Sequence, residues 1–138
     1  MSLRFSIKWD NLDNYSRYLA SDMPQAFEES VVEALDKGAD AARDRAKELV
    51  AVDTGSLQKS IRKERHAWPA GNITYVGIRA GGYVVNPKTK RLVDYAIYVE
   101  YGTSRQRPQP YMRPAIIWAS KQIEGNFWKA LSRRVKVE

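Results

Sequence analysis

The sequence predicts an α+β protein in which a long helix near the N-terminus and a helix at the C-terminus pack on a small antiparallel sheet. Two stretches of helical periodicity enclose a middle stretch of short β-branched and aromatic segments. The length of 138 residues is that of one domain, and 43% hydrophobic with 28% charged residues is ordinary for a folded protein. We therefore treat residues 1–138 as a single domain with a frayed tail at 132–138.

The first long helix is predicted over residues 24–50. Ser21 or Asp22 can cap its start, Pro24 suits its first turn, and its length is about 40 Å. Gly38 in its middle costs about 1 kcal/mol relative to alanine, so it either permits a close approach or is simply tolerated. A shorter helix is expected at 14–20. The long helix has apolar residues at spacings of three and four: Phe27, Val31, Leu35, Ala39, Ala42, Ala46 and Leu49.

Turn and strand signals follow. The sequence Asp53-Thr54-Gly55 ends the long helix, because aspartate bonds its own following amides and glycine accepts a positive φ. Leu57 and Ile61 are four residues apart and fit one helical turn. The charged stretch 62–66 then reads as an exposed or edge strand.

The middle of the chain predicts an antiparallel sheet. A turn at 69–72 precedes a strand at 73–78, and the segments 83–85 and 91–93 flank a hairpin with a basic tip at 86–90. Residues 95–101 fit both a strand and a short helix.

A proline-bracketed loop at 105–110 leads to the last helix, which Pro114 starts. The apolar stripe of this helix is Ile116, Ala119, Ile123, Phe127 and Leu131, with Trp128 beside it.

Charge is unevenly distributed along the chain. The net charge is +7 overall, made up of −3 over residues 24–50, +7 over 58–92 and +6 over 103–138, together with the smaller remaining segments. Such asymmetry can steer the packing of identical copies or attract a polyanion such as DNA, and ordinary solvated surface charge is the plainer reading. The chain has no cysteine, which suits a reducing cytoplasm, and no apolar run that could cross a bilayer.

Two motifs about fifty residues apart carry a family resemblance. The first is Val52-Asp53-Thr54-Gly55-Ser56-Leu57 with Ser60-Ile61, and the second runs from Tyr95 to Thr103 and into Pro108-Gln109-Pro110-Tyr111-Met112-Arg113-Pro114. In this order and spacing they resemble the head-tail joining or tail-completion proteins of long-tailed bacteriophages, the lambdoid gene-ten tail-component type. The resemblance covers residues 24–120 and favours a short helix at 95–101, whereas the N-terminal segment 1–23 matches the family poorly.

The resemblance implies a virion structural protein of the neck. Family members work as rings, with six copies in place, between the head-closure or connector ring and the tail terminator or tube. It implies assembly in the cytoplasm of a bacterial host, contact with the genomic DNA in passing, and no enzyme activity, cofactor, metal or membrane.

The same resemblance implies two sets of site residues. The family-motif residues with structural or interaction roles are Asp53, Thr54, Gly55, Leu57, Ser60, Ile61, Tyr95, Tyr98, Val99, Glu100, Gly102, Thr103, Pro110 and Pro114. The candidate partner contacts, on the hairpin at 86–91 and the arm at 103–110, are Lys88, Lys90, Arg91, Arg105 and Arg107.

Glu100 has two readings. It is either a partly buried acceptor that bonds Arg105, Arg107 or the amides of the Gly102–Thr103 turn, or a surface glutamate next to a turn.

Two other functions compete with the joining role. A small basic DNA-binding protein is compatible with the charge and with Trp9, Trp68, Trp118 and Trp128, although no reading helix or aromatic platform is present. A homodimeric aspartic protease would use Asp53, but that catalytic loop normally follows a strand and here it follows a helix. His66 is the only histidine, so it offers little material for a catalytic triad or a metal site.

Overall fold

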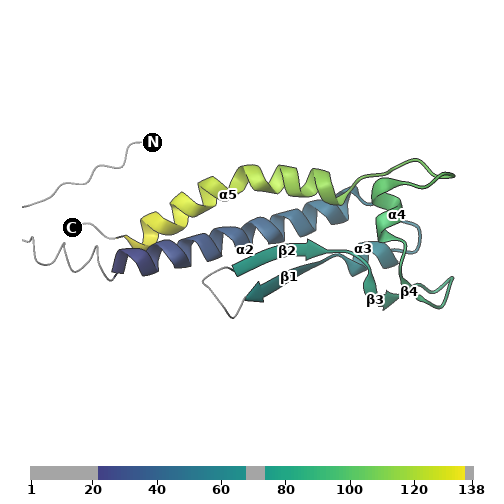
Figure 1. The fold of residues 1–138 in the computed structure, drawn as a ribbon, viewed down its shortest axis with the longest axis horizontal. Coiled ribbons are helices and arrows are strands. Elements are labelled where there is room, and N and C mark those ends of the chain that lie inside the picture. The colour runs from purple at the N-terminus through teal and green to yellow at the C-terminus, as the bar shows by residue number, and fades with distance from the viewer. Residues whose placement is uncertain (1–21, 68–73, 136–138) are drawn as a thin grey trace, which may run out of the picture.

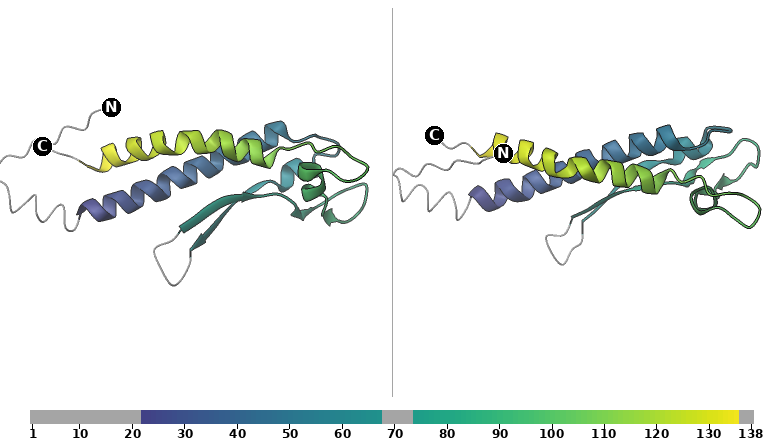
Figure 2. Two further views of the ribbon diagram at one scale, coloured as in Figure 1. Left: turned by 45° about the horizontal axis from the view of Figure 1, so that its top comes forward. Right: turned by 90° about the horizontal axis from the view of Figure 1, so that it is seen from above.

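The computed structural model describes residues 22–67 and 74–135, and it has the predicted α+β architecture. Two long helices, α2 (Met23–Leu49) and α5 (Met112–Arg134), run side by side in opposite directions. A hairpin of β1 (Arg62–Ala67) and β2 (Thr74–Arg79) lies along the other side of α2 (Figure 1). The remaining short elements gather at one end of the helix pair (Figure 2).

These short elements, with their connecting loops, form what we call the end cluster. It consists of α3 (Ser56–Ser60), β3 (Gly82–Val85), β4 (Leu92–Val93) and α4 (Ala96–Tyr101). The predicted helical turn at 57–61, the hairpin around 86–90 and the short helix at 95–101 are therefore confirmed. The turn predicted at 69–72 and the helix predicted at 14–20 lie outside the described residues.

The strands differ from the prediction in one respect. The described strands form two separate two-stranded antiparallel sheets, β1–β2 and β3–β4, where one sheet was expected. The chain passes from β2 to β3 through Gly81 and Gly82, which both have a positive φ, and this bend turns β3 away from β1 and β2. A Cβ on Gly81 would lie 3.1 Å from the carbonyl oxygen of Val93, so the bend also depends on a small residue.

The apolar core lies where the helix pair meets the end cluster. Its buried members come from α2 and the loop after it, α3, β4 and the start of α5: Ala46, Val50, Leu57, Ile61, Val93, Tyr111 and Ala115. Because these segments are far apart in the sequence, the core holds the end cluster against the helices.

Small residues line the buried face of α2, where larger ones were predicted. They recur every four residues: Ala26, Ser30, Ala34, Gly38, Ala42 and Ala46. Ala39, Ala42 and Ala46 are buried as predicted, whereas Phe27 is 50% exposed and Leu49 is 41% exposed. On α5, Ala119 and Leu131 are buried as predicted, but Ile116 is half exposed.

The C-terminal end of α5 reaches further than expected. The helix continues to Arg134, into the segment predicted as a frayed tail. Arg133 and Arg134 form ion pairs with Glu33, and Arg134 also pairs with Glu29. These pairs connect the last turn of α5 to α2. Residues 136–138 lie outside the described part of the chain.

Candidate functional site

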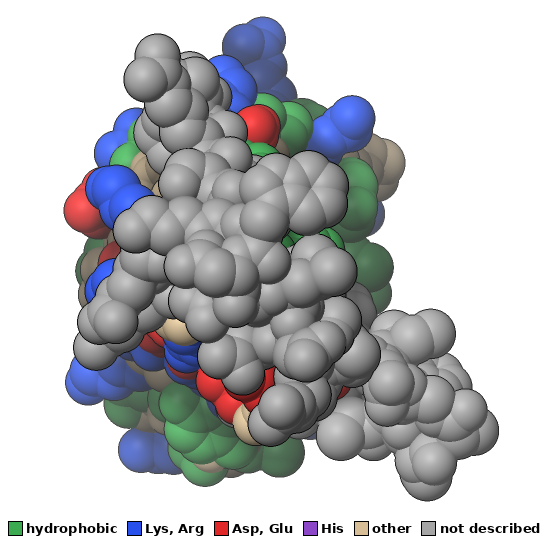
Figure 3. All heavy atoms as spheres, turned by 90° about the vertical axis from the view of Figure 1, so that its left-hand side faces the viewer, with side chains coloured by type: hydrophobic (Ala, Val, Ile, Leu, Met, Phe, Trp, Pro, Cys, Tyr) green, Lys and Arg blue, Asp and Glu red, His purple; other side chains and the backbone are tan. Residues whose placement is uncertain are grey.

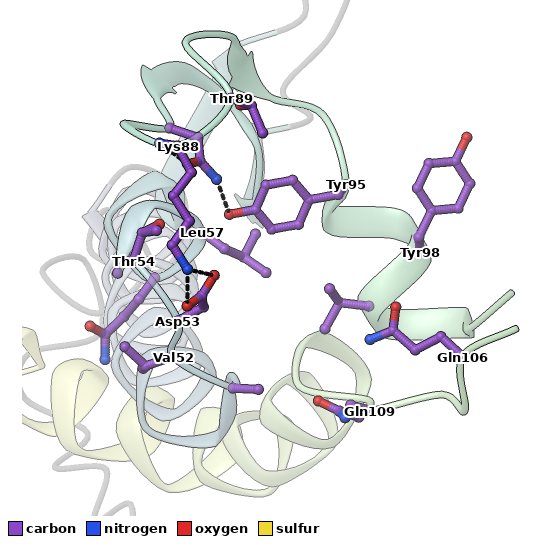
Figure 4. A pocket seen from close by; sticks show the side chains of 15 residues that line it. Val52, Asp53, Thr54, Leu57, Lys88, Thr89, Tyr95, Tyr98, Gln106 and Gln109 are labelled. Atoms are coloured by element: carbon purple, nitrogen blue, oxygen red, sulfur yellow. Dashed lines mark hydrogen bonds and ion pairs between the residues drawn. The ribbon is translucent and has the colours of Figure 1, made fainter.

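The two sequence motifs lie next to each other in the end cluster, around a surface pocket of about 430 Å³ (Figure 4). Asp53 and Lys88 face each other on one side of this pocket, and Tyr98, Gln106 and Gln109 lie across from them. The motif residues that line it are Asp53, Thr54, Gly55, Leu57, Tyr95, Tyr98 and Val99. Segments that are separated by about forty residues in the sequence therefore form one surface.

Glu100 is the buried polar residue that organises this end of the molecule. Its side chain is 8% exposed, and its carboxylate accepts hydrogen bonds from the backbone N–H groups of Tyr111, Met112 and Arg113 at 2.8, 2.9 and 3.0 Å. The acceptor role is as expected, but the donors differ from the expected Arg105, Arg107 or Gly102–Thr103 amides.

These three donors belong to the first turn of α5. Tyr111 is the N-cap, and the next position after Arg113 is Pro114, which has no N–H group. The backbone donors that a helix leaves unsatisfied at its start are thus all accounted for, by Glu100 and by the proline. A carboxylate at this position also interacts favourably with the positive end of the helix dipole.

Gly102 directs the chain from α4 into the arm at 103–110. Its φ is 75° and its ψ is 179°, a combination that only glycine adopts readily. A Cβ at this position would lie 2.7 Å from the backbone nitrogen of Pro108 and 2.8 Å from the carbonyl oxygen of Gln106. Position 102 therefore requires glycine for both backbone conformation and space.

The arm itself is an ordered loop. The Thr103 N–H donates to the Gln106 carbonyl, and the Thr103 hydroxyl accepts from the N–H groups of Arg105 and Gln106. The Gln109 N–H then donates to the carbonyl of Val99 at 2.8 Å, which returns the arm to α4. Pro110 is exposed at its end, and Arg105 and Arg107 extend from it as exposed side chains.

The Asp53-Thr54-Gly55 turn works differently from the prediction. The Asp53 carboxylate accepts from the Lys88 ammonium group at 2.7 and 2.9 Å, across to the loop between β3 and β4. Thr54 makes the local turn bond, since its hydroxyl oxygen accepts from the Ser56 N–H. Gly55 has the predicted positive φ, at 78°, but it is the N-cap of α3. The turn therefore does not end α2 as expected, because α2 stops at Leu49 and Val50 is already extended.

Ser60 and Ile61, the last two residues of the first motif, are fully buried. The Ser60 hydroxyl donates to the Leu57 carbonyl at 2.6 Å and accepts from the Gly81 N–H at 2.8 Å. Ser60 thereby ties the end of α3 to the bend that begins β3.

Among the predicted contact residues, Lys88, Lys90 and Arg91 are exposed in the loop between β3 and β4. Lys88 is occupied by Asp53, and Lys90 has a positive φ of 58°. Lys88 thus differs from the other predicted contact residues of the loop and the arm, because it already pairs with Asp53 of the same chain.

Sequence reasoning missed two residues that hold this region together. Asn86 is buried, its side-chain amide donates to the Tyr95 hydroxyl, and its side-chain oxygen accepts from the Lys88 N–H. Tyr111 is buried and donates from its hydroxyl to the Ala96 carbonyl at 3.2 Å. Burial, the Glu100 carboxylate and Tyr95 raise the pKa of Tyr111 to about 12, so it remains a donor. Asn before Pro in a hairpin was the available signal for Asn86.

The pocket is lined by charged, amide, hydroxyl and apolar side chains. Within residues 22–67 and 74–135, no cluster of three or more His, Asp or Glu side chains could hold a metal ion. No helix in these same ranges is long and apolar enough to span a membrane.

A family model described as "Bacteriophage HK97-gp10, putative tail-component" matches residues 13–102. The match contains the first motif whole and the second as far as Gly102, so Thr103, Pro110 and Pro114 lie beyond it. It also begins eleven residues before the start of the resemblance at residue 24. The comparisons with curated proteins and with solved structures gave no significant match.

Proposed function

This chain belongs to the HK97-gp10-like family of bacteriophage tail components, and we propose that it is the neck protein that joins the head connector to the tail. In this proposal, copies of the chain form a ring, with six in place. One side of the ring contacts the head-closure or connector protein, and the other contacts the tail terminator or tube. The ring assembles in the cytoplasm of the bacterial host and remains in the virion.

The observation that carries the proposal is the exposure of large apolar side chains on the end cluster. Tyr101 is 69% exposed and Ile97 is 60% exposed, both on the short helix α4. Others on the same group of elements are Val52, Tyr83, Val85, Leu92 and Tyr98, all more than half exposed. Exposed apolar groups gathered in this way are typical of protein–protein interfaces, and aromatic residues often anchor them.

The hydrogen bonds within the end cluster support the same proposal. Glu100 connects α4 to α5, and Gly102 and Thr103 shape the arm between them. These bonds would hold the arm close to the conformation that a partner contacts, which would lower the entropic cost of assembly. Lys90, Arg91, Arg105 and Arg107 would supply contacts to neighbouring proteins or to DNA in the ring lumen.

The distribution of basic side chains favours a protein partner over DNA as the main ligand. In the view from the side where α2 begins, the visible lysine and arginine side chains lie next to acidic and apolar ones around the edge of the molecule (Figure 3). The acidic stretch of α2 pairs with basic residues of this same chain, since Asp36 and Asp40 bind Lys63 at 3.0 Å each. Part of the charge asymmetry is thus neutralised within the molecule.

The first experiment is electron microscopy of a phage lysate in which this gene is deleted, with complementation by the intact gene in parallel. The joining role predicts separate DNA-filled heads and tails, and complementation should restore complete virions. Tails of abnormal length would assign the protein to tail termination. Normal infectious particles would overturn a structural role and favour DNA binding.

A surface substitution tests the apolar contacts directly. Ile97→Asp with Tyr101→Asp should leave the isolated protein folded, because both side chains are exposed, yet fail to complement the deletion. Lys129→Asp, also exposed but on α5, is the control and should complement. Normal virions with the double variant would contradict the use of α4 as an interface.

A further inference from the structure

An apolar groove runs between the two long helices and the β1–β2 hairpin. Its volume is about 260 Å³, and Ser120 is the one hydroxyl-bearing residue among those that line it. The lining comes from α2 (Leu35, Gly38, Ala39, Ala42), β2 (Val76, Gly77, Ile78) and α5 (Ile116, Ala119, Ser120, Ile123). Ile116 is half exposed, so the groove leaves a large apolar side chain in contact with solvent.

The groove lies next to β2, and no described residue of β1 is among those that line it. Three consecutive residues of this strand line it, although side chains along a strand alternate between faces. The backbone of β2, at Gly77 in particular, is therefore part of the groove wall. β1 pairs with one edge of β2, and no other strand in the described ranges pairs with the second edge. An open strand edge next to an apolar surface is a site where another strand can add.

The sequence contains a segment with the pattern of such a strand. Residues 3–9 alternate strictly between apolar residues, Leu3, Phe5, Ile7 and Trp9, and polar ones, Arg4, Ser6 and Lys8. An alternation of this kind indicates a strand with one buried and one solvent-exposed face. Seven residues span about 23 Å as a strand.

The length and direction of the chain are compatible with this placement. β2 runs in the same direction as α2 (Figure 1), so a strand antiparallel to β2 would end near the side on which α2 begins. Leu35, the nearest groove residue on α2, lies about 18 Å along the helix from Met23. Residues 10–22 can span about 43 Å when extended, or about 30 Å if the helix predicted at 14–20 forms.

We propose that residues 3–9 of the same chain bind in this groove as a third strand, antiparallel to β2. Phe5 and Ile7, with their apolar neighbours, would cover Leu35, Ile116 and Ile123, and Arg4, Ser6 and Lys8 would face solvent. The addition would complete a three-stranded sheet and close an edge that otherwise invites association with other chains. The inference is independent of the proposed neck function.

Engineered disulfides test the placement, because the chain has no cysteine of its own. Single cysteines at each of positions 4–8 are combined with Leu35→Cys or with Ile123→Cys in the full-length protein and oxidised. A disulfide needs Cα atoms about 4.4–6.8 Å apart and Cβ atoms that point towards each other. Its formation therefore shows which residues of the segment face the groove. We expect intramolecular disulfides from Phe5→Cys or Ile7→Cys, and none from the matched controls Arg4→Cys, Ser6→Cys and Lys8→Cys.

Each other result overturns the proposal. Disulfides that join two chains would assign the groove to a second copy. Equal reactivity at all five positions, or none, would show that the segment does not bind there as a strand.

Hydrogen exchange provides a second measurement that needs no oxidation. Replacing Phe5 and Ile7 together by serine should accelerate exchange of the β2 amides at the free edge on the order of tenfold, because those N–H groups lose their partners. Replacing Arg4 and Lys8 by serine should leave the exchange unchanged. Equal exchange in the two variants would contradict the proposal.

Discussion

At the scale of single residues, Glu100 has the largest structural role in the end cluster. One carboxylate satisfies three backbone donors from a segment more than ten residues further along the chain. Hydrogen bonds to a charged acceptor are stronger than neutral ones, and buried donors left without a partner are costly. The orientation of α4 against α5 therefore depends on this side chain.

Replacing Glu100 by alanine should lower the free energy of unfolding by about 2–4 kcal/mol, because a helix cap is lost and buried amides become unsatisfied. Glu100→Gln keeps one carbonyl oxygen, so its free energy of unfolding should lie between those of the wild type and Glu100→Ala. Chemical denaturation measures both. Glu124→Ala, an exposed glutamate on α5, is the control. An equally small effect at both positions would contradict the capping role.

Gly102 gives a second prediction at this scale. Gly102→Ala should destabilise the protein by about 2 kcal/mol or more, because its backbone conformation and its space both exclude a Cβ. The matched control is Gly125→Ala, since a Cβ at that helical position meets no atom within 4 Å. The control should be neutral or stabilising, by up to about 1 kcal/mol. Thermal unfolding of the two variants compares them directly.

At the scale of elements, the contact between α2 and α5 depends on small side chains. The ridge of small residues on α2 lets α5 approach closely, and a Cβ on Gly38 would lie 2.9 Å from Cγ1 of Ile123. Further along, Phe27 and Phe127 pack edge to face with ring centroids 5.1 Å apart. The helix pair is thus close-packed in its middle. Nearer the end at which α2 begins, aromatic rings make the contact.

Gly38→Val should destabilise the protein by about 1–3 kcal/mol through overpacking against Ile123. Removing the opposing bulk with Ile123→Ala should recover part of this loss in the double variant. A double-mutant cycle from denaturation curves measures the coupling. Gly125→Val serves as the control with no opposing side chain, and strictly additive effects of Gly38→Val and Ile123→Ala would contradict the contact.

Element prediction from the sequence succeeded where the signal was local. The helix at 24–50, the turn at Gly55 and the hairpin around 86–90 follow from periodicity and turn residues alone. The buried face of α2 was only partly predicted, because a hydrophobic stripe was sought in large residues. Close helix packing buries small residues instead, and Phe27 and Leu49 are left half exposed.

At the scale of the whole molecule, ion pairs connect the acidic helix α2 to basic segments elsewhere. Among the carboxyl groups of α2, Glu33 has the pKa that these ion pairs lower most. Hydrogen bonds from Lys37, Arg134 and Arg133 lower the pKa of its carboxyl from 4.5 to about 2. The pKa of Glu29 is also lowered, by Gln25 and Arg134.

A carboxyl whose pKa is depressed on folding stabilises the protein above the unfolded pKa, and this stabilisation is lost as the pH falls towards the folded value. The wild-type protein should therefore lose stability between pH 4.5 and about 2. Glu33→Gln should be less stable than the wild type at pH 7, with a difference that shrinks over this range. Melting temperatures across the range measure it, and Glu124→Gln is the control. A constant difference would contradict the assignment to Glu33.

The candidate site shows the same division between local and distant information. Gly55 was assigned from turn chemistry, Gly102 was named as a family-motif residue, and Glu100 was singled out as a partly buried acceptor or a surface residue. Its actual donors at Tyr111, Met112 and Arg113 were not identified. Asp53 was expected to bond its own turn, whereas its carboxylate binds Lys88, thirty-five residues away. The family-motif residues remain proposed interaction residues.

The sequence by itself determined the fold class, the order of the elements and the two motifs that identify the family. These depend on periodicity, turn residues and spacing, which act over a few neighbouring positions. The tertiary structure alone decided that the motifs share one pocket, that Glu100 caps α5, that small residues line the helix contact and that the described strands form two sheets. Each of these requires groups far apart in the chain to meet, and local preferences carry no information about which distant partner a side chain reaches.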